Sequence, residues 1–450
     1  MEFVKTIFAK YKPYYWSSLV VAAPVVISQL GHTLVQTADS IVVGQFAGTI
    51  PLAAVSLVHS VFMIVLVLGL GIAYGITPLV AQENGRKNYI ECAKLLSNSI
   101  AINALTGIAL FLLVYFGSMA VIDHLGQSPA VVKEAKPYLL ILSLSIFPLM
   151  IFSAFKQFAE GLGFTRQAMN ITIWGNVLNI ILAIVFVKGM FGIPPMGVRG
   201  VGYATLIDRI LMSLAMGIYL FKAPIFKQYI QGFSWLFIES GRAIKLLRIG
   251  APVAMQYVFE IGAFATAAIL AGTFGAEAQA AHQVAIQLAS STYMMASGVA
   301  AAATIRVGTS YGKKNSYRLK MYASSSYHII ILFMSFTALV FILFNNFLPH
   351  IFTQDKAVVA IASQLLLLAG IFQLFDGTQV VGLGILRGVS DVNVPTFIAF
   401  VSYWVIGIPV AYILSKYTSL GLIGIWYGLT IGLMFSSVLL FFRYRRKTNN

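Results

Sequence analysis

Apolar residues along this chain form twelve long runs, separated by short polar segments. A helix crosses the hydrocarbon core of a bilayer, about 30 Å thick, with about 20 residues, and each run has roughly that length. The pattern predicts an all-α polytopic membrane protein with twelve transmembrane helices. Their expected limits are 16–43, 53–79, 95–116, 137–158, 168–187, 201–221, 247–272, 279–304, 321–344, 359–385, 396–415 and 421–442.

The composition agrees with a membrane protein and argues against a soluble domain. Hydrophobic residues make up 59% of the chain and charged residues only 10%, against about 25% charged in ordinary soluble proteins. The net charge of +16 does not indicate nucleic acid binding, because the basic residues lie in the loops between the apolar runs. We therefore expect no nucleic acid partner.

The distribution of basic residues predicts the orientation. If both termini are cytoplasmic, the tails and the junctions between spans on their side, helix ends included, carry 23 of the 30 Lys and Arg residues. The opposite side carries six, and Arg209 lies within a span. Short cytoplasmic loops are enriched in Lys and Arg in membrane proteins. We expect a multi-pass protein with both termini in the cytoplasm.

The two halves of the chain resemble each other at an offset of about 227 residues. Shared motifs recur in the same loops and spans of both halves: Ala23-Pro24-Val25 and Ala251-Pro252-Val253, Gly85-Arg86-Lys87-Asn88 and Gly312-Lys313-Lys314-Asn315, Gly161 and Gly388, and Gly197-Val-Arg-Gly200 and Gly421-Leu-Ile-Gly424. Each half has an even number of spans, so both halves enter the membrane in the same direction. We predict bundles at 1–221 and 247–450, a cytoplasmic linker at 222–246, and a pseudo-twofold axis along the membrane normal.

Three lone carboxylates, without a basic residue beside them, stand inside these apolar runs: Asp39, Glu260 and Asp376. A charged side chain at the bilayer centre costs at least ~2.5–3.5 kcal/mol, so an intramembrane acid is a candidate functional residue by default. We predict that these acids bind protons, sodium ions or organic cations. Asp39 lies near the outer end of its span, so it is the acid for which a structural role, such as capping or pairing, is the strongest alternative.

Other polar residues also lie within the predicted spans. Gln256 lies one helical turn before Glu260, on the same face, and Gln283 and Gln287 repeat this spacing on the next span. Candidate substrate-contacting or supporting residues are Gln256, Gln283, Asn176, Tyr138 and Gln287. The alternative is that they form interhelical hydrogen bonds that only hold the bundles together. We interpret the adjacent residues Asp208 and Arg209 as a structural pair with partners on other helices.

The sequence carries no signature of an energy-converting enzyme. It has no phosphate-binding G-x-x-x-x-G-K-[ST] motif and no Cys and His cluster with metal-ligand spacing. We predict that the protein is not an enzyme, that it needs no cofactor, and that an ion gradient supplies its energy.

Ordered motifs over nearly the whole chain resemble the MATE (multidrug and toxic compound extrusion) family, most closely its NorM-like branch. The motifs are Ala23-Pro24, Ala38-Asp39-Ser40-Ile-Val-Val-Gly44, Leu52-Ala53-Ala54, Glu160-Gly161-Leu-Gly163, Asn176-Val-Leu-Asn179, Gly250-Ala-Pro252, Ala280-Ala-His282-Gln283, Arg306-Val-Gly308, Leu386-Arg387-Gly388 and Gly424-Ile-Trp426. The resemblance implies a two-lobed antiporter that exports cationic, amphipathic compounds in exchange for Na⁺ or H⁺.

The resemblance also implies roles for single residues. Asp39 and Asn179 match the cation-site positions of the family's N-terminal lobe, and Glu260 and Asp376 match the acids of the NorM-like C-terminal lobe. Two residues depart from the pattern of relatives. Ala183 stands where another branch carries a second acid, and Phe372 stands where some relatives have a tyrosine.

We therefore predict a multidrug efflux antiporter of the bacterial inner membrane, with Na⁺ as one candidate ion at Glu260 and Asp376. Its expected partners are organic-cation drugs and membrane lipids. No obligatory protein partner is evident, and we expect a monomer. The alternative is a flippase for a lipid-linked oligosaccharide or another lipid-linked precursor, which would need buried basic residues for an anionic substrate. A channel or a membrane scaffold is disfavoured by the repeat and by the buried acids.

Overall fold

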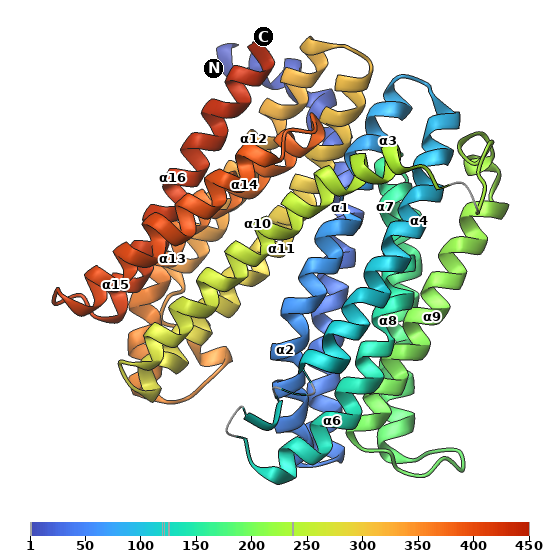
Figure 1. Cartoon of the computed structure of the whole chain (residues 1–450). Helices are drawn as coiled ribbons and strands as arrows, with labels where there is room; N and C mark the ends of the chain where they lie inside the picture. Colours follow the sequence, from blue (N-terminus) through green and yellow to red (C-terminus); the bar gives the residue numbers. More distant parts are fainter. Residues whose placement is uncertain (1, 119, 121, 125–126, 236–237, 450) are drawn as a thin grey trace. The chain divides into compact units, whose positions relative to one another are not determined.

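The computed structural model describes residues 2–118, 120, 122–124, 127–235 and 238–449 of this chain (Figure 1). Those residues contain helices and connecting turns and no strand. The α-helices are α1 (Glu2–Phe46), α2 (Thr49–Ala73), α3 (Ile76–Gly85), α4 (Tyr89–Leu112), α6 (Pro129–Leu144), α7 (Ile146–Gly161), α8 (Thr165–Lys188), α9 (Val198–Lys222), α10 (Ser240–Gly272), α11 (Ala276–Gly312), α12 (Ser316–Leu343), α13 (Lys356–Gly388), α14 (Asn393–Phe400), α15 (Ile408–Lys416) and α16 (Leu422–Asn449).

The predicted all-α fold with twelve spans is confirmed. Within the described part of the chain, twelve helical runs are long and apolar enough to cross a membrane. Several runs extend beyond the predicted limits, and α11 continues to Gly312 rather than ending near 304. Ser145 separates α6 from α7 within one span, and the π-helix η5 (Val401–Gly407) interrupts the span formed by α14 and α15. The hydropathy pattern did not predict these two interruptions.

The chain divides into two compact units. The first, called here the N-terminal unit, comprises Ile27–Ala254. The second, called the C-terminal unit, comprises Met1–Val26 together with Met255–Asn450. Both divisions fall inside long helices, α1 and α10, close to Pro24 and Pro252. The division of the sequence at 221 and 247 into two bundles and a linker therefore stays a prediction.

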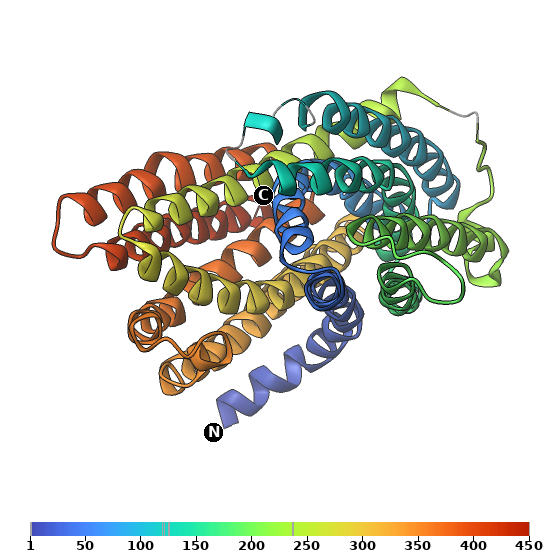
Figure 2. The same ribbon diagram turned by 90° about the horizontal axis from the view of Figure 1, so that it is seen from below.

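The N-terminal unit is built on two apolar clusters. One cluster joins α2, α6, α8 and α9, and includes Val58, Leu139 and Ala204. The other joins α3, α4, α7 and α9, and includes Phe158 and Met216. Helices α8 and α9 run side by side (Figures 1 and 2). Burial of large apolar side chains at these contacts leaves α8 free to present polar residues on the remaining part of its inner face.

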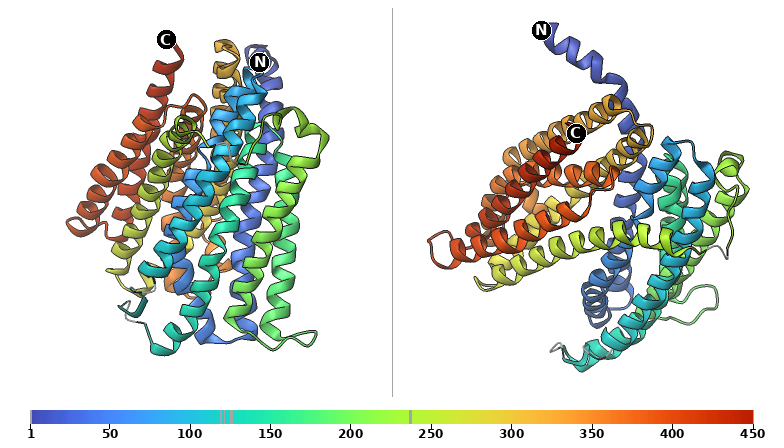
Figure 3. Two further views of the ribbon diagram at one scale, coloured as in Figure 1. Left: turned by 45° about the vertical axis from the view of Figure 1, so that its right-hand side comes forward. Right: turned by 45° about the horizontal axis from the view of Figure 1, so that its top comes forward.

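Helix α13 is the centre of the C-terminal unit and packs against α11, α12 and α16 (Figure 3). A stripe of glycines on α16, spaced four residues apart, contacts η5 and α15. Small residues at this spacing let membrane helices approach closely. A Cβ atom added at Gly428 would lie 2.3 Å from the backbone nitrogen of Ala411, so no larger residue fits there without movement.

The internal repeat is visible as equivalent backbone contacts in the two units. The Thr77 hydroxyl donates a hydrogen bond to the Gln157 carbonyl across 3.5 Å, and the Thr304 hydroxyl donates to the Gly384 carbonyl across 2.8 Å. In each unit, the donor helix and the acceptor helix lie close together because a glycine, Gly161 or Gly388, lies one turn after the residue whose carbonyl accepts the bond. A Cβ atom at either glycine would approach the carbonyl oxygen of Thr77 or Thr304 to 2.9 Å.

The cytoplasmic linker of the sequence prediction is attached to α4 in the N-terminal unit. The guanidinium group of Arg242 donates two hydrogen bonds to the Glu91 carboxylate, at 2.8 and 2.7 Å. The backbone nitrogen of Glu239 donates to the Asn98 side chain across 2.8 Å. Charge-assisted, bidentate pairs are among the stronger hydrogen bonds in proteins, so this linker is held in a defined position where it meets α10.

Candidate cation sites

Asp39 is buried in the N-terminal unit, within electrostatic range of Asp208 and Arg209 of α9. The side chains of Asp39 and Asn179 are 4% and 1% exposed, so both lie inside the bundle. The Asn179 amide nitrogen donates a hydrogen bond to the Thr205 hydroxyl of α9 across 3.3 Å. Among the described residues, Asp39 Oδ1 and Asn179 Oδ1 have no hydrogen-bond partner. Since a buried oxygen without a donor is costly, these oxygens are available to a bound cation or proton.

The partners expected for Asp208 and Arg209 lie on other helices. Arg209 donates a hydrogen bond to the Ser145 hydroxyl across 2.6 Å, at the interruption between α6 and α7. Asp208 lies beside the Asn179 amide. Both residues are also within electrostatic range of Asp39, so the sequence interpretation of a purely structural pair misses their position in the polar cluster.

Tyr138 and Asn176 flank this cluster. Tyr138 is fully buried, and its hydroxyl forms a hydrogen bond of 3.1 Å with His59 Nε2. Tyr138 is also within electrostatic range of Asp39. Asn176 lies against Gly31 of α1, because a Cβ atom added to Gly31 would lie 2.5 Å from the Asn176 amide nitrogen. Both side chains therefore help to define the surroundings of Asp39.

Glu260 and Asp376 approach each other in the C-terminal unit. Their side chains, on α10 and α13, are 6% and 2% exposed and within electrostatic range of each other. The Tyr293 hydroxyl of α11 donates a hydrogen bond to Glu260. Asp376 Oδ1 has no hydrogen-bond partner among the described residues. Two buried carboxylates repel each other unless a proton or another cation accompanies them, so this pair is suited to cation binding.

A basic residue also lies near this pair. Arg387, at the end of α13, is within electrostatic range of Glu260 and hydrogen-bonds to Tyr257 of α10. Tyr403 of η5 is within electrostatic range of both acids and exchanges hydrogen bonds of 2.9 and 3.1 Å with Gln379. The acid pair is therefore surrounded by tyrosine hydroxyls and one arginine.

Gln256, predicted on the same helix face as Glu260, forms a hydrogen bond with another helix. The amide nitrogen of Gln256 donates a hydrogen bond to the Thr396 hydroxyl across 2.9 Å, which joins α10 to α14. This is the bundle-holding contact that the sequence left open as an alternative. Phe372 is buried against Trp426, with ring centroids 5.4 Å apart, and contributes no oxygen beside Asp376.

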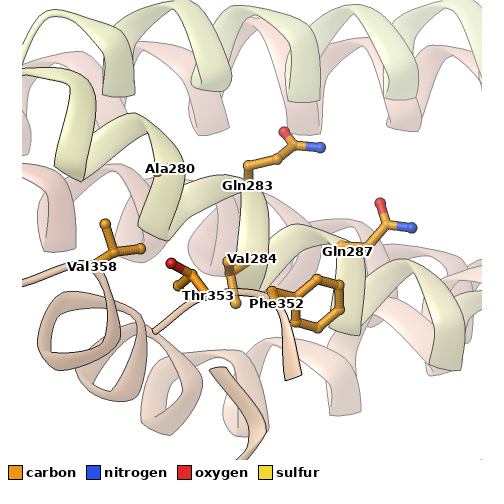
Figure 4. Close-up of a pocket in the computed structure, with 7 residues that line it drawn as sticks. All are labelled: Ala280, Gln283, Val284, Gln287, Phe352, Thr353 and Val358. Carbon is orange, nitrogen blue, oxygen red and sulfur yellow. The ribbon is translucent and has the colours of Figure 1, made fainter. Parts of the chain in front are cut away.

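Gln283 and Gln287 line a pocket in the C-terminal unit (Figure 4). Its volume is about 430 Å³, within the range of about 300–1,000 Å³ for small-molecule sites. The two glutamine side chains project from α11 on the same side (Figure 4). The remaining lining residues are Ala280, Val284, Phe352, Thr353 and Val358. The pocket is therefore mostly apolar, with two amides and a hydroxyl.

A twelve-span helical chain with an internal repeat and a buried acid cluster in each unit has the architecture of a membrane transporter. The comparisons with known proteins identify which kind. The family model MatE matches residues 24–185 and again residues 252–413. The chain belongs to this family, and the resemblance seen in its motifs is confirmed. The two matches begin 228 residues apart (252 minus 24), so they also confirm the internal repeat.

Named relatives extend over almost the entire chain. The chain is 34% identical to the probable multidrug resistance protein NorM of Bacillus licheniformis, with 96% of this chain and 95% of the relative covered. It is 31% identical to the multidrug resistance protein NorM of Aliivibrio fischeri, with 93% and 92% covered. The crystal structure of the eukaryotic MATE transporter AtDTX14 has the same fold, with a TM-score of 0.87, 20% identity and 98% of each chain covered.

Proposed function

We propose that this chain is a secondary-active multidrug efflux antiporter that exports amphipathic organic cations in exchange for Na⁺ or H⁺. Membership of the MatE family and the names of relatives at 31–34% identity support multidrug efflux. The observation that carries the antiport is the buried pair Glu260 and Asp376, with one Asp376 oxygen unpartnered among the described residues. Such a pair stabilises a cation in a medium where an isolated charge is unfavourable.

In this proposal, Glu260 and Asp376 bind the coupling ion, and Asp39 and Asn179 form a second cation site. The coupling ion and the drug are both positively charged, so they compete for the same negative charge. Entry of the ion therefore favours release of the drug. Tyr293 supports this role, because its hydroxyl is positioned to donate to Glu260 when the carboxylate is charged.

The pocket on α11 is the proposed contact for the apolar body of the drug. Phe352 offers an aromatic ring, and Gln283 and Gln287 offer amide oxygens that accept hydrogen bonds from amine or ammonium groups. Its residues include no acid. The positive charge of the drug would therefore be recognised elsewhere, at one of the acid clusters.

The remaining features of the proposal concern the membrane. The positive-inside distribution supports two cytoplasmic termini, and bacterial relatives support the inner membrane. We expect the protein to work as a monomer with lipids around it, because each unit encloses its own acid cluster. Transport in this scheme changes no covalent bond, so the protein acts as a transporter without a cofactor.

The test is uptake of ethidium into inverted membrane vesicles, with a Na⁺ gradient and a pH gradient imposed separately. Uptake driven by one gradient supports the antiporter and identifies its ion. Glu260→Gln removes the charge and keeps the shape, so gradient-driven uptake should fall at least about tenfold, a change of about 1.4 kcal/mol. The matched control is Glu277→Gln, because Glu277 is exposed in the first turn of α11.

Two results would contradict the proposal. Unchanged transport by Glu260→Gln would remove the C-terminal acid pair from the coupling mechanism. Failure of both gradients to drive any of several organic cations, with correctly folded protein in the vesicles, would favour the lipid-linked substrate instead.

A further inference from the structure

A second carboxylate shares the polar cluster of the N-terminal unit with Asp39. Asp208, on α9, is 4% exposed and lies within electrostatic range of Asp39. Its Oδ1 atom has no hydrogen-bond partner among the described residues. Asp208 is also hydrogen-bonded to the Asn179 amide and lies close to the Arg209 charge, but burying a carboxylate oxygen without a donor is unfavourable, so this one oxygen is open to a bound cation.

The backbone is shaped to accommodate this oxygen. Gly175 of α8 faces Asp208, and a Cβ atom at this position would lie 2.6 Å from Asp208 Oδ1. The same Cβ atom would lie 2.5 Å from Met212 Cγ, so any residue other than glycine would crowd both the Met212 side chain and the carboxylate. Gly175 and Asn179 are four residues apart, so they lie on the same face of α8.

Two further oxygens belong to the same cluster. Thr205 lies one turn before Asp208 on α9, and its hydroxyl accepts the hydrogen bond from the Asn179 amide nitrogen. That bond orients the amide and leaves Asn179 Oδ1, on a side chain that is 1% exposed, without a partner in the described part of the chain. The side chains of Asp39, Asp208, Asn179 and Thr205 thus gather oxygen atoms from α1, α8 and α9 in one buried place.

The charges of the cluster indicate how many cations it holds. When Asp39 and Asp208 are both ionised they carry two negative charges, and Arg209, which is hydrogen-bonded to Ser145, carries one positive charge close to both. The neighbouring Tyr138 and His59 are hydrogen-bonded to each other and add no charge when neutral. The remaining charge is one negative unit, which a single monovalent cation neutralises.

We propose that Asp208 is a ligand of a monovalent-cation site in the N-terminal unit, together with Asp39, Asn179 and Thr205. The cation bound at this site is one Na⁺ ion or one proton. This inference rests on the proposed antiport and deepens it, because it adds a residue and a stoichiometry of one ion to the second site. Arg209 sets the charge of the site without binding the cation.

The experiment isolates this site in the full chain. In a Glu260→Gln and Asp376→Asn background, purified protein is tested for ²²Na⁺ binding at equilibrium and for proton uptake with a pH indicator. We expect one Na⁺ or one proton to bind per chain. Binding of ²²Na⁺ would identify sodium as the cation, and proton uptake would identify the proton. Adding Asp208→Asn should weaken that binding at least tenfold. Adding Asp391→Asn instead should leave it unchanged, because Asp391 is an acid paired with Arg443 outside the cluster.

A double change separates a ligand from a charge partner. Asp208→Asn combined with Arg209→Gln restores a net charge of one negative unit but lacks the Asp208 oxygen. If Asp208 is a ligand, binding stays weak in the double variant. Full recovery of binding would show that Asp208 only balances Arg209, and would overturn the proposal.

Two further measurements complete the test. Gly175→Ala keeps every charge but crowds the Asp208 carboxylate together with Met212, so it should weaken binding in the same direction. If the background does not fold by size-exclusion chromatography and thermal melting, Asp208→Asn in the otherwise unchanged chain should lose one bound cation per molecule. A folded background that binds no cation would overturn this site while gradient-driven efflux, measured on the unchanged chain, still tests the antiporter.

Discussion

Replacement of Gly428 by alanine tests the packing of α16 against α15. The new Cβ atom would lie 2.3 Å from the backbone nitrogen of Ala411 and 2.4 Å from its Cα atom, whereas ordinary contacts begin at 3.4 Å. The helices must therefore separate locally by about 1 Å (3.4 minus 2.3). A Cβ atom added at Gly424 or Gly432 would likewise lie 2.6 Å from the backbone of Leu414 or Ser402. Neither helix is free to rotate away without disturbing these contacts.

The cost follows from this displacement. A gap of 0.5–1 Å forfeits about a quarter to a half of each dispersion contact, and overpacking of a tight core costs about 1–3 kcal/mol. We expect Gly428→Ala to lower the free energy of unfolding by about 2 kcal/mol, which reduces the folded-to-unfolded ratio about thirtyfold. The measurement is reversible unfolding in mixed detergent micelles, followed by intrinsic tryptophan fluorescence.

The matched control is Gly370→Ala on α13. Its new Cβ atom would meet the end of the Ile342 side chain at 3.3 Å, which needs a shift of only a few tenths of an ångström. Alanine also favours a helix over glycine by up to about 1 kcal/mol. We expect Gly370→Ala to unfold like the unchanged protein or slightly later. If Gly428→Ala unfolds like this control, the close approach of α15 and α16 is not the feature that stabilises the unit.

Three further substitutions concern the first turns of helices and the segment before α10. Arg242→Gln removes the bidentate contact with Glu91. A charge-assisted pair that is mostly shielded from water contributes about 1–2 kcal/mol, so trypsin should cleave the variant after Lys227 about five to thirty times faster. An unchanged cleavage rate would contradict this role. Asn315→Ala removes the side chain that accepts from the Arg318 backbone nitrogen at 2.9 Å and should cost about 1 kcal/mol of stability. Asn88→Ala, at the equivalent cap with a longer bond of 3.3 Å, should cost less in the same unfolding assay.

The twelve spans could be predicted because a bilayer imposes a length and an apolar composition on each helix. The ends of the spans could not, because hydropathy averages over residues that continue a helix for other reasons. Arg306 illustrates this. It lies beyond the predicted limit of its span, yet the helix continues past it, and its guanidinium group donates a hydrogen bond to the Ser17 carbonyl at 2.9 Å. That contact joins residues far apart in the sequence.

The buried acids were equally visible in the sequence, since each interrupts an apolar run. Their surroundings were not. Asp208 was interpreted as half of a structural pair, because adjacency to Arg209 is a local pattern and its position near Asp39 depends on how α1, α8 and α9 pack. Similarly, Arg387 lies near Glu260 only because the end of α13 packs against α10. Local patterns identify the unusual residues, and tertiary packing determines their partners.

The internal repeat keeps the helix contacts of the two units equivalent but not the positions of their acids, and this difference has a physical cause. Thr77 with Gly161 and Thr304 with Gly388 occupy equivalent places, because two backbones that approach this closely tolerate only glycine at the contact. The acids obey no such constraint, since a carboxylate needs only an inward-facing position and room for an oxygen. Asp39 and Glu260 are accordingly not equivalent by the repeat offset. Under the proposed antiport, two units with one scaffold and different acids would bind their cations with different affinities, and the weaker site would release its ion first.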